Sequence, residues 1–288
     1  SPYPFALVFC FAMQLLAGHA QLTWYTGLLA FAWVLVGGWV NGRGRGTLKS
    51  MMAFGLAVFL AVLIAGVQLI PTAELLLQSQ RAESVSYETA MTYSFWPWRT
   101  LSIFMPDFFG NPGHGTYWGY ASYWEDALYF GIFPLGSALS VLLAVFSKVR
   151  DELKKARFRV LVIIAWIVSI VAFILALGKF TPVYSFLYQY IPTFDMFNSP
   201  TRWLLLVEFL WIILAGIGLE RMNGSAKMKR RMRLALFAAV VLVVISFGVG
   251  QALGQADVSF IRSLSTFGIM IAISCIFIIW RPAEISKT

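Results

Sequence analysis

Two acidic side chains in the longest polar stretch of the sequence have the chemistry of a general base. Glu74 and Asp107 lie between an apolar run that ends near residue 70 and another that begins near residue 126. A positioned carboxylate can take the proton of a hydroxyl group as that hydroxyl attacks a substrate. We therefore name Glu74 and Asp107 as the catalytic candidates.

Basic and polar side chains that suit a phosphate or a hydroxyl group accompany these acids. Guanidinium and ammonium groups bind phosphate oxygens, whereas amide and imidazole groups exchange hydrogen bonds with hydroxyls. The substrate-binding candidates are His19, Gln21, Arg81, His114, Lys179 and Arg202.

Two sets of candidate residues also have simpler explanations, which stay open. His19 and Gln21 equally suit a polar cap at a turn between helices. If residues 74–83 are helical, Glu74, Gln78 and Arg81 share one face, which suits either a substrate or an amphipathic helix lying on a membrane surface.

Three further acids lie at the edge of an apolar run or inside one. Glu125 and Asp126 can act as a base or hold a divalent cation, but acids also favour a helix N-terminus, which we prefer for Asp126. Glu208 lies inside an apolar run, where an acid predicts function, and its partner is either Arg202 or a group on another helix.

Metal chemistry has little support in the sequence. Cys10 and Cys275 lie far apart inside apolar runs and offer neither a disulfide framework nor metal-ligand spacing. We predict no metal centre and no cofactor, with a divalent cation at the acidic pair as the open alternative.

The elements that must position these residues are membrane-spanning helices. Hydrophobic residues make up 59% of the 288 positions, charged residues only 12%, and mean hydropathy is +0.76. We predict an all-α, polytopic transmembrane bundle of about eight spans, because a water-soluble domain carries about a quarter charged residues. The predicted spans cover 3–18, 22–40, 51–70, 126–146, 160–177, 203–219, 234–253 and 263–280.

The basic residues predict the orientation of these spans. Seventeen of the 22 Lys and Arg residues fall in one set of alternate loops, and only Arg81, Arg99, Lys179, Arg202 and Arg262 fall in the other. The positive-inside rule places the larger set in the cytoplasm. Because the net charge of +9 is confined to such clusters, we expect no nucleic-acid partner.

A large outer loop, 71–125, is the most unusual part of the sequence. Residues 93–124 hold twelve aromatic side chains, and Gly and Pro residues punctuate 106–115 like an ordered, turn-rich loop. An interfacial belt uses Trp and Tyr too, but aromatic faces also stack on sugars and prenyl chains. We treat 1–288 as a single transmembrane module, expected to be a segment of a longer chain.

Several short stretches resemble the YfhO family of bacterial membrane proteins, which are similar to GT-C type glycosyltransferases. They include Gly18–Gln21, Ser79 with Arg81, Pro106–Gly110, Tyr129–Leu135, Ser199–Trp203 and Leu214–Leu219. The resemblance implies sugar transfer from a polyprenyl-phosphate donor to a cell-envelope acceptor, on the outer face of a bacterial plasma membrane. It supplies no catalytic base, and it marks His19, Arg81 and Arg202 as neighbours of the substrate.

Two other classes of function stay open. A transporter or lipid flippase needs several ionisable groups near the middle of the bilayer, and the spans offer Glu208 with a few polar residues such as Gln14, Gln68 and Gln251. A scaffold would use the aromatic loop to bind a partner protein. We expect a lipid-linked sugar donor and membrane lipids as partners, and the sequence does not indicate an oligomeric state.

Overall fold

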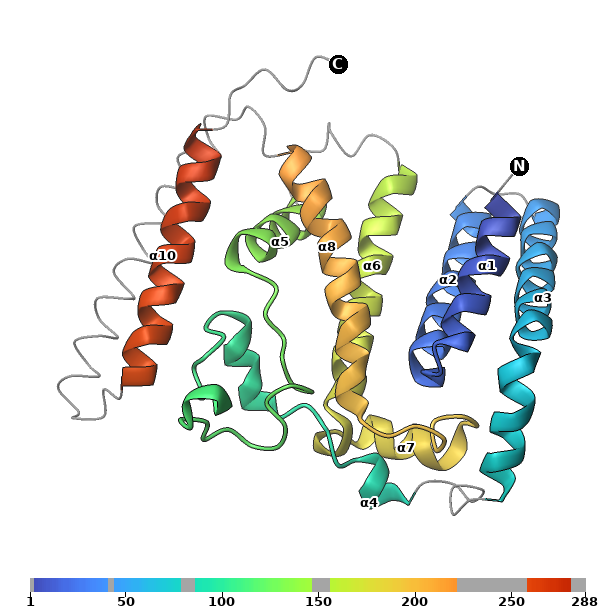
Figure 1. Ribbon diagram of the computed structural model, residues 1–288. Helices are drawn as coiled ribbons and strands as arrows, with labels where there is room; N and C mark the ends of the chain where they lie inside the picture. The colour runs from blue at the N-terminus through green and yellow to red at the C-terminus, as the bar shows by residue number, and fades with distance from the viewer. Residues whose placement is uncertain (1–2, 41–43, 79–85, 147–155, 222–257, 281–288) are drawn as a thin grey trace. The chain divides into compact units, whose positions relative to one another are not determined.

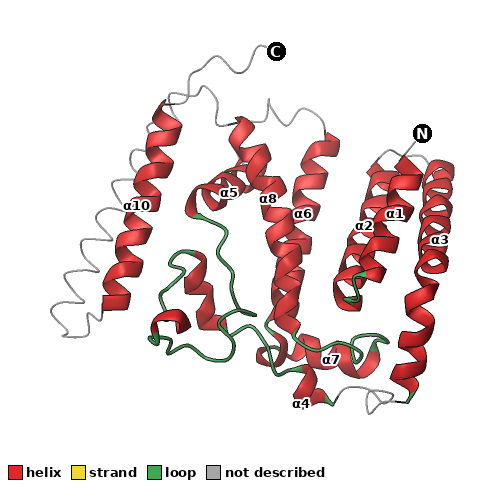
Figure 2. Cartoon of the chain, viewed as in Figure 1, coloured by secondary structure: helices red, strands yellow, loops and turns green. Residues whose placement is uncertain are grey.

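The computed structural model describes residues 3–40, 44–78, 86–146, 156–221 and 258–280. Within these ranges the chain is helical and holds no β-strand (Figure 2). It divides into two compact units. The first comprises 1–89, 155–161 and 192–197, and the second comprises 90–154, 162–191 and 198–288.

Four helical stretches among the described residues are long and apolar enough to cross a membrane. They are Ala20–Gly38, Gly46–Leu77, Phe158–Ala176 and Pro200–Glu220. Each holds at least 19 residues, or about 28 Å of helix at 1.5 Å per residue, close to the roughly 30 Å of a bilayer core. These helices are compatible with an integral membrane protein, as the composition predicts.

The first unit contains three helices that pack against one another (Figure 1). They are α1 (Tyr3–Leu16), α2 (Ala20–Val40) and α3 (Gly44–Leu77). Phe11, Ala12 and Ala61 form their buried core, and Phe54 packs edge-on against Phe11 at 5.9 Å between ring centroids. Small residues at this contact let α1 and α3 approach closely, as in other membrane helix pairs.

The described residues of the second unit form four longer helices and several short ones. The longer helices are α5 (Ile132–Phe146), α6 (Ala156–Ala176), α8 (Leu204–Arg221) and α10 (Val258–Trp280). The first residues of α6, up to Leu161, belong to the first unit. Helix α5 packs against both α8 and α10. The short elements are η1 (Pro97–Ile103), η2 (Pro112–His114), η3 (Gly178–Phe180), α7 (Pro182–Tyr190) and η4 (Pro200–Trp203). The short helix α4 (Tyr87–Ala90) lies at the boundary, with only Ala90 in the second unit.

Two predicted boundaries are wrong. The span expected to end at residue 70 continues as one helix to Leu77, with Pro71 inside it, so the loop predicted to start at residue 71 begins with helix. The span expected to start at 126 starts at Ile132 instead. Gly131 precedes it with a φ of +90°, which a helix does not allow, and Pro134 suits a first helical turn.

The remaining predicted spans have mixed outcomes. Helices α1, α5 and α10 occupy the positions of the predicted spans 3–18, 126–146 and 263–280, but α1 and α5 have only 14 and 15 residues. The predicted span 234–253 lies outside the described residues. The total of eight spans, the single module and the orientation therefore stay predictions.

Candidate functional site

The aromatic segment, residues 93–131, is built around a buried arginine. Arg99 lies in η1 and is only 1% exposed. Its guanidinium carbon lies 5.7, 5.3 and 5.1 Å from the ring centroids of Phe109, Tyr117 and Tyr123. Its Nη2 donates a hydrogen bond of 3.1 Å to the carbonyl of Tyr123. A cation held between aromatic rings is stabilised most where water is excluded, so Arg99 ties the segment into one folded body.

The carboxylate of Asp107 is held on this body by two donors. The Tyr123 hydroxyl and the Asn111 side-chain amide donate to its Oδ1 at 3.1 and 3.3 Å. The same amide lies 3.3 Å from the Tyr123 hydroxyl. Burial raises the pKa of Tyr123, and the neighbouring Asp107 charge raises it further, so Tyr123 keeps the proton that it donates.

The turn that carries Asn111 depends on a glycine. Gly110 has a φ of +77°, and a Cβ there would collide with the carbonyl of Thr116. Asn111 then caps η2 by accepting a hydrogen bond of 2.8 Å from the Gly113 N–H. The turn predicted from Gly and Pro at 106–115 is therefore present, and it fixes the direction of the Asn111 amide toward Asp107.

Lys179 is fixed against the same aromatic segment from another part of the chain. Its backbone N–H donates to the buried Ser94 Oγ at 3.1 Å, and its ammonium donates to the Tyr120 hydroxyl at 2.7 Å. The ammonium also lies 5.1 and 5.6 Å from the rings of Tyr120 and Phe180. An ammonium has three donors, so Lys179 keeps donors for a further acceptor.

Rings and hydrogen bonds connect the Lys179 and Asp107 positions. The Tyr117 hydroxyl donates to the Tyr120 carbonyl at 3.0 Å, and the Tyr117 and Tyr123 rings meet edge-on at 5.6 Å. Tyr123 contacts Asp107, and Tyr120 contacts Lys179. A cation and a carboxylate therefore belong to one aromatic cluster.

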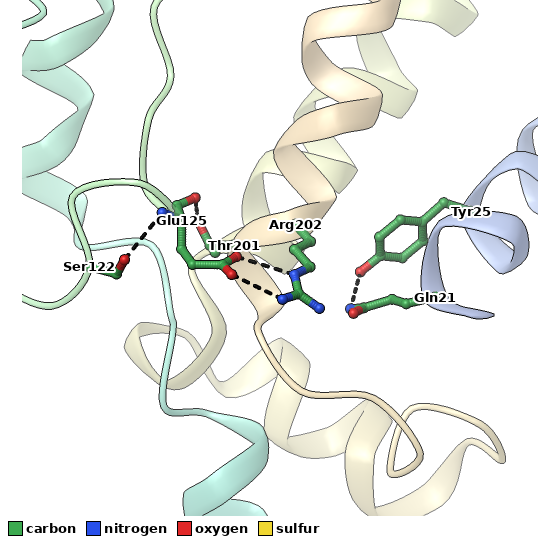
Figure 3. Close-up of polar contacts among 6 residues, drawn as sticks. All are labelled: Gln21, Tyr25, Ser122, Glu125, Thr201 and Arg202. Atoms are coloured by element: carbon green, nitrogen blue, oxygen red, sulfur yellow. Dashed lines mark hydrogen bonds and ion pairs between the residues drawn. The ribbon is translucent and has the colours of Figure 1, made fainter. Parts of the chain in front are cut away.

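Arg202 forms an ion pair with Glu125. Its Nε and Nη2 donate to the two carboxylate oxygens at 3.2 and 2.9 Å (Figure 3). The preceding Thr201 donates its hydroxyl to the Glu125 carbonyl at 3.2 Å, so two neighbouring residues hold Glu125. The partner of Arg202 is thus Glu125 rather than Glu208, and this pairing engages a guanidinium edge that would otherwise suit a phosphate.

Asp126 has a different environment from its neighbour. It is fully buried, and neither carboxylate oxygen has a hydrogen-bond partner among the described residues. Burial raises the pKa of Asp126 to about 6, although the neighbouring Thr201 hydroxyl and the positive charge of Arg99 partly oppose the rise. Asp126 does not lie at the start of a helix, because α5 starts at Ile132, and that prediction is wrong.

Of the remaining candidates, His19, Gln21 and Glu74 belong to the first unit, and His114 belongs to the aromatic segment. His19 is exposed at the start of α2, and its carbonyl accepts the Thr23 N–H. Gln21 is buried in the first unit and donates to the Tyr25 hydroxyl at 2.9 Å (Figure 3). Glu74 is exposed on α3, and His114 is exposed at the end of η2. Arg81 lies outside the described residues, so the predicted stripe of Glu74, Gln78 and Arg81 is untested.

Metal binding has no support from the part of the chain that the structure describes. Within it, no group of three or more His, Cys, Asp or Glu side chains is placed to hold a metal ion. Glu125 is paired with Arg202, and Asp126 is buried beside it. The open alternative of a cation at the acidic pair therefore gains no argument from the geometry.

No known protein family, curated protein or solved structure matches this chain.

The cluster has features that the sequence alone does not reveal. In the sequence Arg99 stands out only as a basic residue on the predicted outer side, and no spacing marks Asn111 and Tyr123 as partners of Asp107. The one signal that pointed to them was the density of aromatic residues around a single arginine.

Proposed function

We propose that the chain is a membrane glycosyltransferase of the GT-C type. In this proposal it moves a sugar from a polyprenyl-phosphate donor to an acceptor hydroxyl, on the outer face of a bacterial plasma membrane. The observation that carries the proposal is the carboxylate of Asp107, oriented by Tyr123 and Asn111 within a cluster that also holds Lys179. The resemblance to the YfhO family motivates the choice of donor.

Asp107 is the general base in this proposal. The hydrogen bonds from Tyr123 and Asn111 both go to Oδ1, and the Asp107 side chain is partly exposed. The Oδ2 of Asp107 accepts the proton of the acceptor hydroxyl. At the same time, the oxygen of that hydroxyl attacks the anomeric carbon of the sugar. The bond from the anomeric carbon to the phosphate oxygen breaks, and its electron pair stays on the phosphate. Glu74 is the less suitable base, because no such partners orient it among the described residues.

Lys179 is the phosphate ligand in this proposal. Its remaining ammonium donors suit the charge that develops on the leaving phosphate. Arg202 is bound to Glu125, so it ties the aromatic segment at Glu125 to η4 instead of contacting phosphate. Exposed rings beside the cluster, among them Trp118 and Trp124, offer faces on which a sugar can stack.

Donor binding tests the proposal. The probe is a short-chain polyprenyl phosphate that carries glucose, mannose or N-acetylglucosamine, added to the full-length protein in detergent. We expect saturable binding with at least one sugar and roughly tenfold weaker binding by Lys179→Ala, since a charge-assisted contact contributes about 1.5 kcal/mol or more. Lys49→Ala is the matched control, because Lys49 is exposed on α3. Equal binding by wild type and Lys179→Ala would remove Lys179 from the site.

A further inference from the structure

A cavity lies between α5 and α8, and the end of the aromatic segment, at Tyr129 and Phe130, contributes to its lining. Its volume is about 460 Å³, within the range of roughly 300–1,000 Å³ typical of small-molecule sites. Aromatic and aliphatic side chains make up most of its lining, and Glu208 supplies a carboxylate. The lining residues used below are Tyr129, Phe130, Phe133, Ser137, Glu208 and Gly216.

Within the described ranges, Glu208 has no partner that would explain its presence in a membrane helix. No hydrogen bond or ion pair joins its carboxylate to any residue in the described ranges. An ionisable group inside a span is expensive, and such groups generally face a cavity or pair with an opposite charge. Glu208 faces a cavity, so the missing opposite charge is expected from a ligand.

The walls of this cavity are held by a close approach of the two helices. A Cβ at Gly218 of α8 would collide with the backbone carbonyl of Ser137 on α5. Trp211 of α8 meets the ring of Phe130 at 5.9 Å and the ring of Trp166 on α6 at 6.0 Å. These contacts fix the aromatic side of the lining relative to Glu208.

We propose that this cavity binds an organic cation with an apolar body, whose charged nitrogen pairs with Glu208. Aromatic rings around a carboxylate are suited to quaternary and alkylated ammonium groups, because ring faces attract a cation that is easily desolvated. The apolar remainder of the lining suits alkyl or aryl substituents. An inorganic cation is a poorer fit, since it needs several oxygen ligands and the lining offers few.

Binding of a permanently charged probe tests this assignment. Radiolabelled benzyltriethylammonium is titrated onto the full-length protein in lipid nanodiscs, with an uncharged carbon isostere as competitor. We expect saturable binding that Glu208→Gln weakens at least roughly tenfold, because the substitution removes one partner of the charge pair. The uncharged isostere is expected to compete at least roughly tenfold less well.

A second variant occupies the cavity without touching the acid. A Cβ at Gly216 meets nothing within 4 Å, so Gly216→Leu has room in the cavity and is expected to abolish binding. Gly136→Leu is its matched control: Gly136 also has open space, lies on α5 and does not line the cavity. Gly136→Leu is expected to bind like wild type.

The assignment fails under any of three results. These are no saturable binding by wild type, wild-type affinity in Glu208→Gln or Gly216→Leu, and equal competition by the uncharged isostere. Sugar transfer by the aromatic cluster is a separate property, so neither result decides the other.

Discussion

Arg202 and Glu125 form a two-point ion pair across 77 residues of sequence, with donor to acceptor distances of 3.2 and 2.9 Å. The pair joins η4, which directly precedes α8, to the aromatic segment. Both side chains are 28% exposed, so the surroundings screen the attraction only in part. The parallel geometry of the two bonds specifies Arg, since Lys presents a single ammonium.

We predict a measurable coupling between these two residues. In a double-mutant cycle of Arg202→Lys and Glu125→Gln, the coupling free energy of unfolding is expected to be about 0.5–1 kcal/mol, the upper part of the range for exposed pairs. Thermal and denaturant unfolding in detergent measures it. Additive effects of the two substitutions would show that the pair contributes nothing to stability.

Arg99→Ala is predicted to destabilise the aromatic segment strongly. The substitution removes three ring contacts and a hydrogen bond, and it leaves buried Asp126 without its neighbouring positive charge. We expect a loss of about 3 kcal/mol or more in unfolding free energy. The adjacent Trp98→Ala is the control, because Trp98 is 66% exposed and its loss is expected to be about 0.5 kcal/mol. Similar losses for both variants would contradict the buried role of Arg99.

The pH dependence of stability is predicted to contain a contribution from Asp126. The folded state raises the pKa of Asp126 from 3.8 to about 6, so folding favours the protonated acid. This contribution is fully present below pH 3.8 and is lost as the pH rises to about 6. Asp126→Asn is therefore expected to be more stable than wild type above about pH 6.5, by on the order of 2–3 kcal/mol, with a smaller difference near pH 4. A difference that does not change with pH would contradict the assignment.

Gly218→Ala is predicted to disturb the contact between α5 and α8. The added methyl group meets the Ser137 backbone, which cannot move aside as a flexible side chain would. Overpacking of this kind costs about 1–3 kcal/mol. Gly136→Ala is the control, because its Cβ meets nothing within 4 Å. Equal melting temperatures for both variants in detergent would show that the helices do not approach at Gly218.

The sequence was most informative about the long apolar helices. Runs of about twenty apolar residues predict α2, α3, α6 and α8, since few other structures satisfy the backbone in lipid. Their ends were predicted less well. Pro71, Thr72 and Glu74 suggest a loop, yet α3 continues through them to Leu77. Gly131 delays the start of α5 to Ile132.

The candidate site was only partly predictable, because its contacts join distant parts of the chain. The residue types of Asp107 and Lys179, and their predicted place on the outer side of the membrane, identify both as candidates. Their partners Tyr123 and Tyr120 lie 16 and 59 residues away, a separation that residue spacing does not encode. The burial of Arg99 and Asp126 contradicts the usual exposure of charged residues, so no pattern of single residues would have indicated it.

Sugar transfer by the full-length protein with and without Asp107 tests the central proposal most directly. The assay follows radiolabelled sugar from a polyprenyl-phosphate donor into acceptor under single-turnover conditions, in wild type, Asp107→Asn and the control Asp195→Asn. We predict transfer by wild type, a rate at least about 100-fold lower in Asp107→Asn with donor binding retained, and a wild-type rate in Asp195→Asn. Transfer at the wild-type rate in Asp107→Asn, or no transfer by wild type from any of the donors, would contradict it.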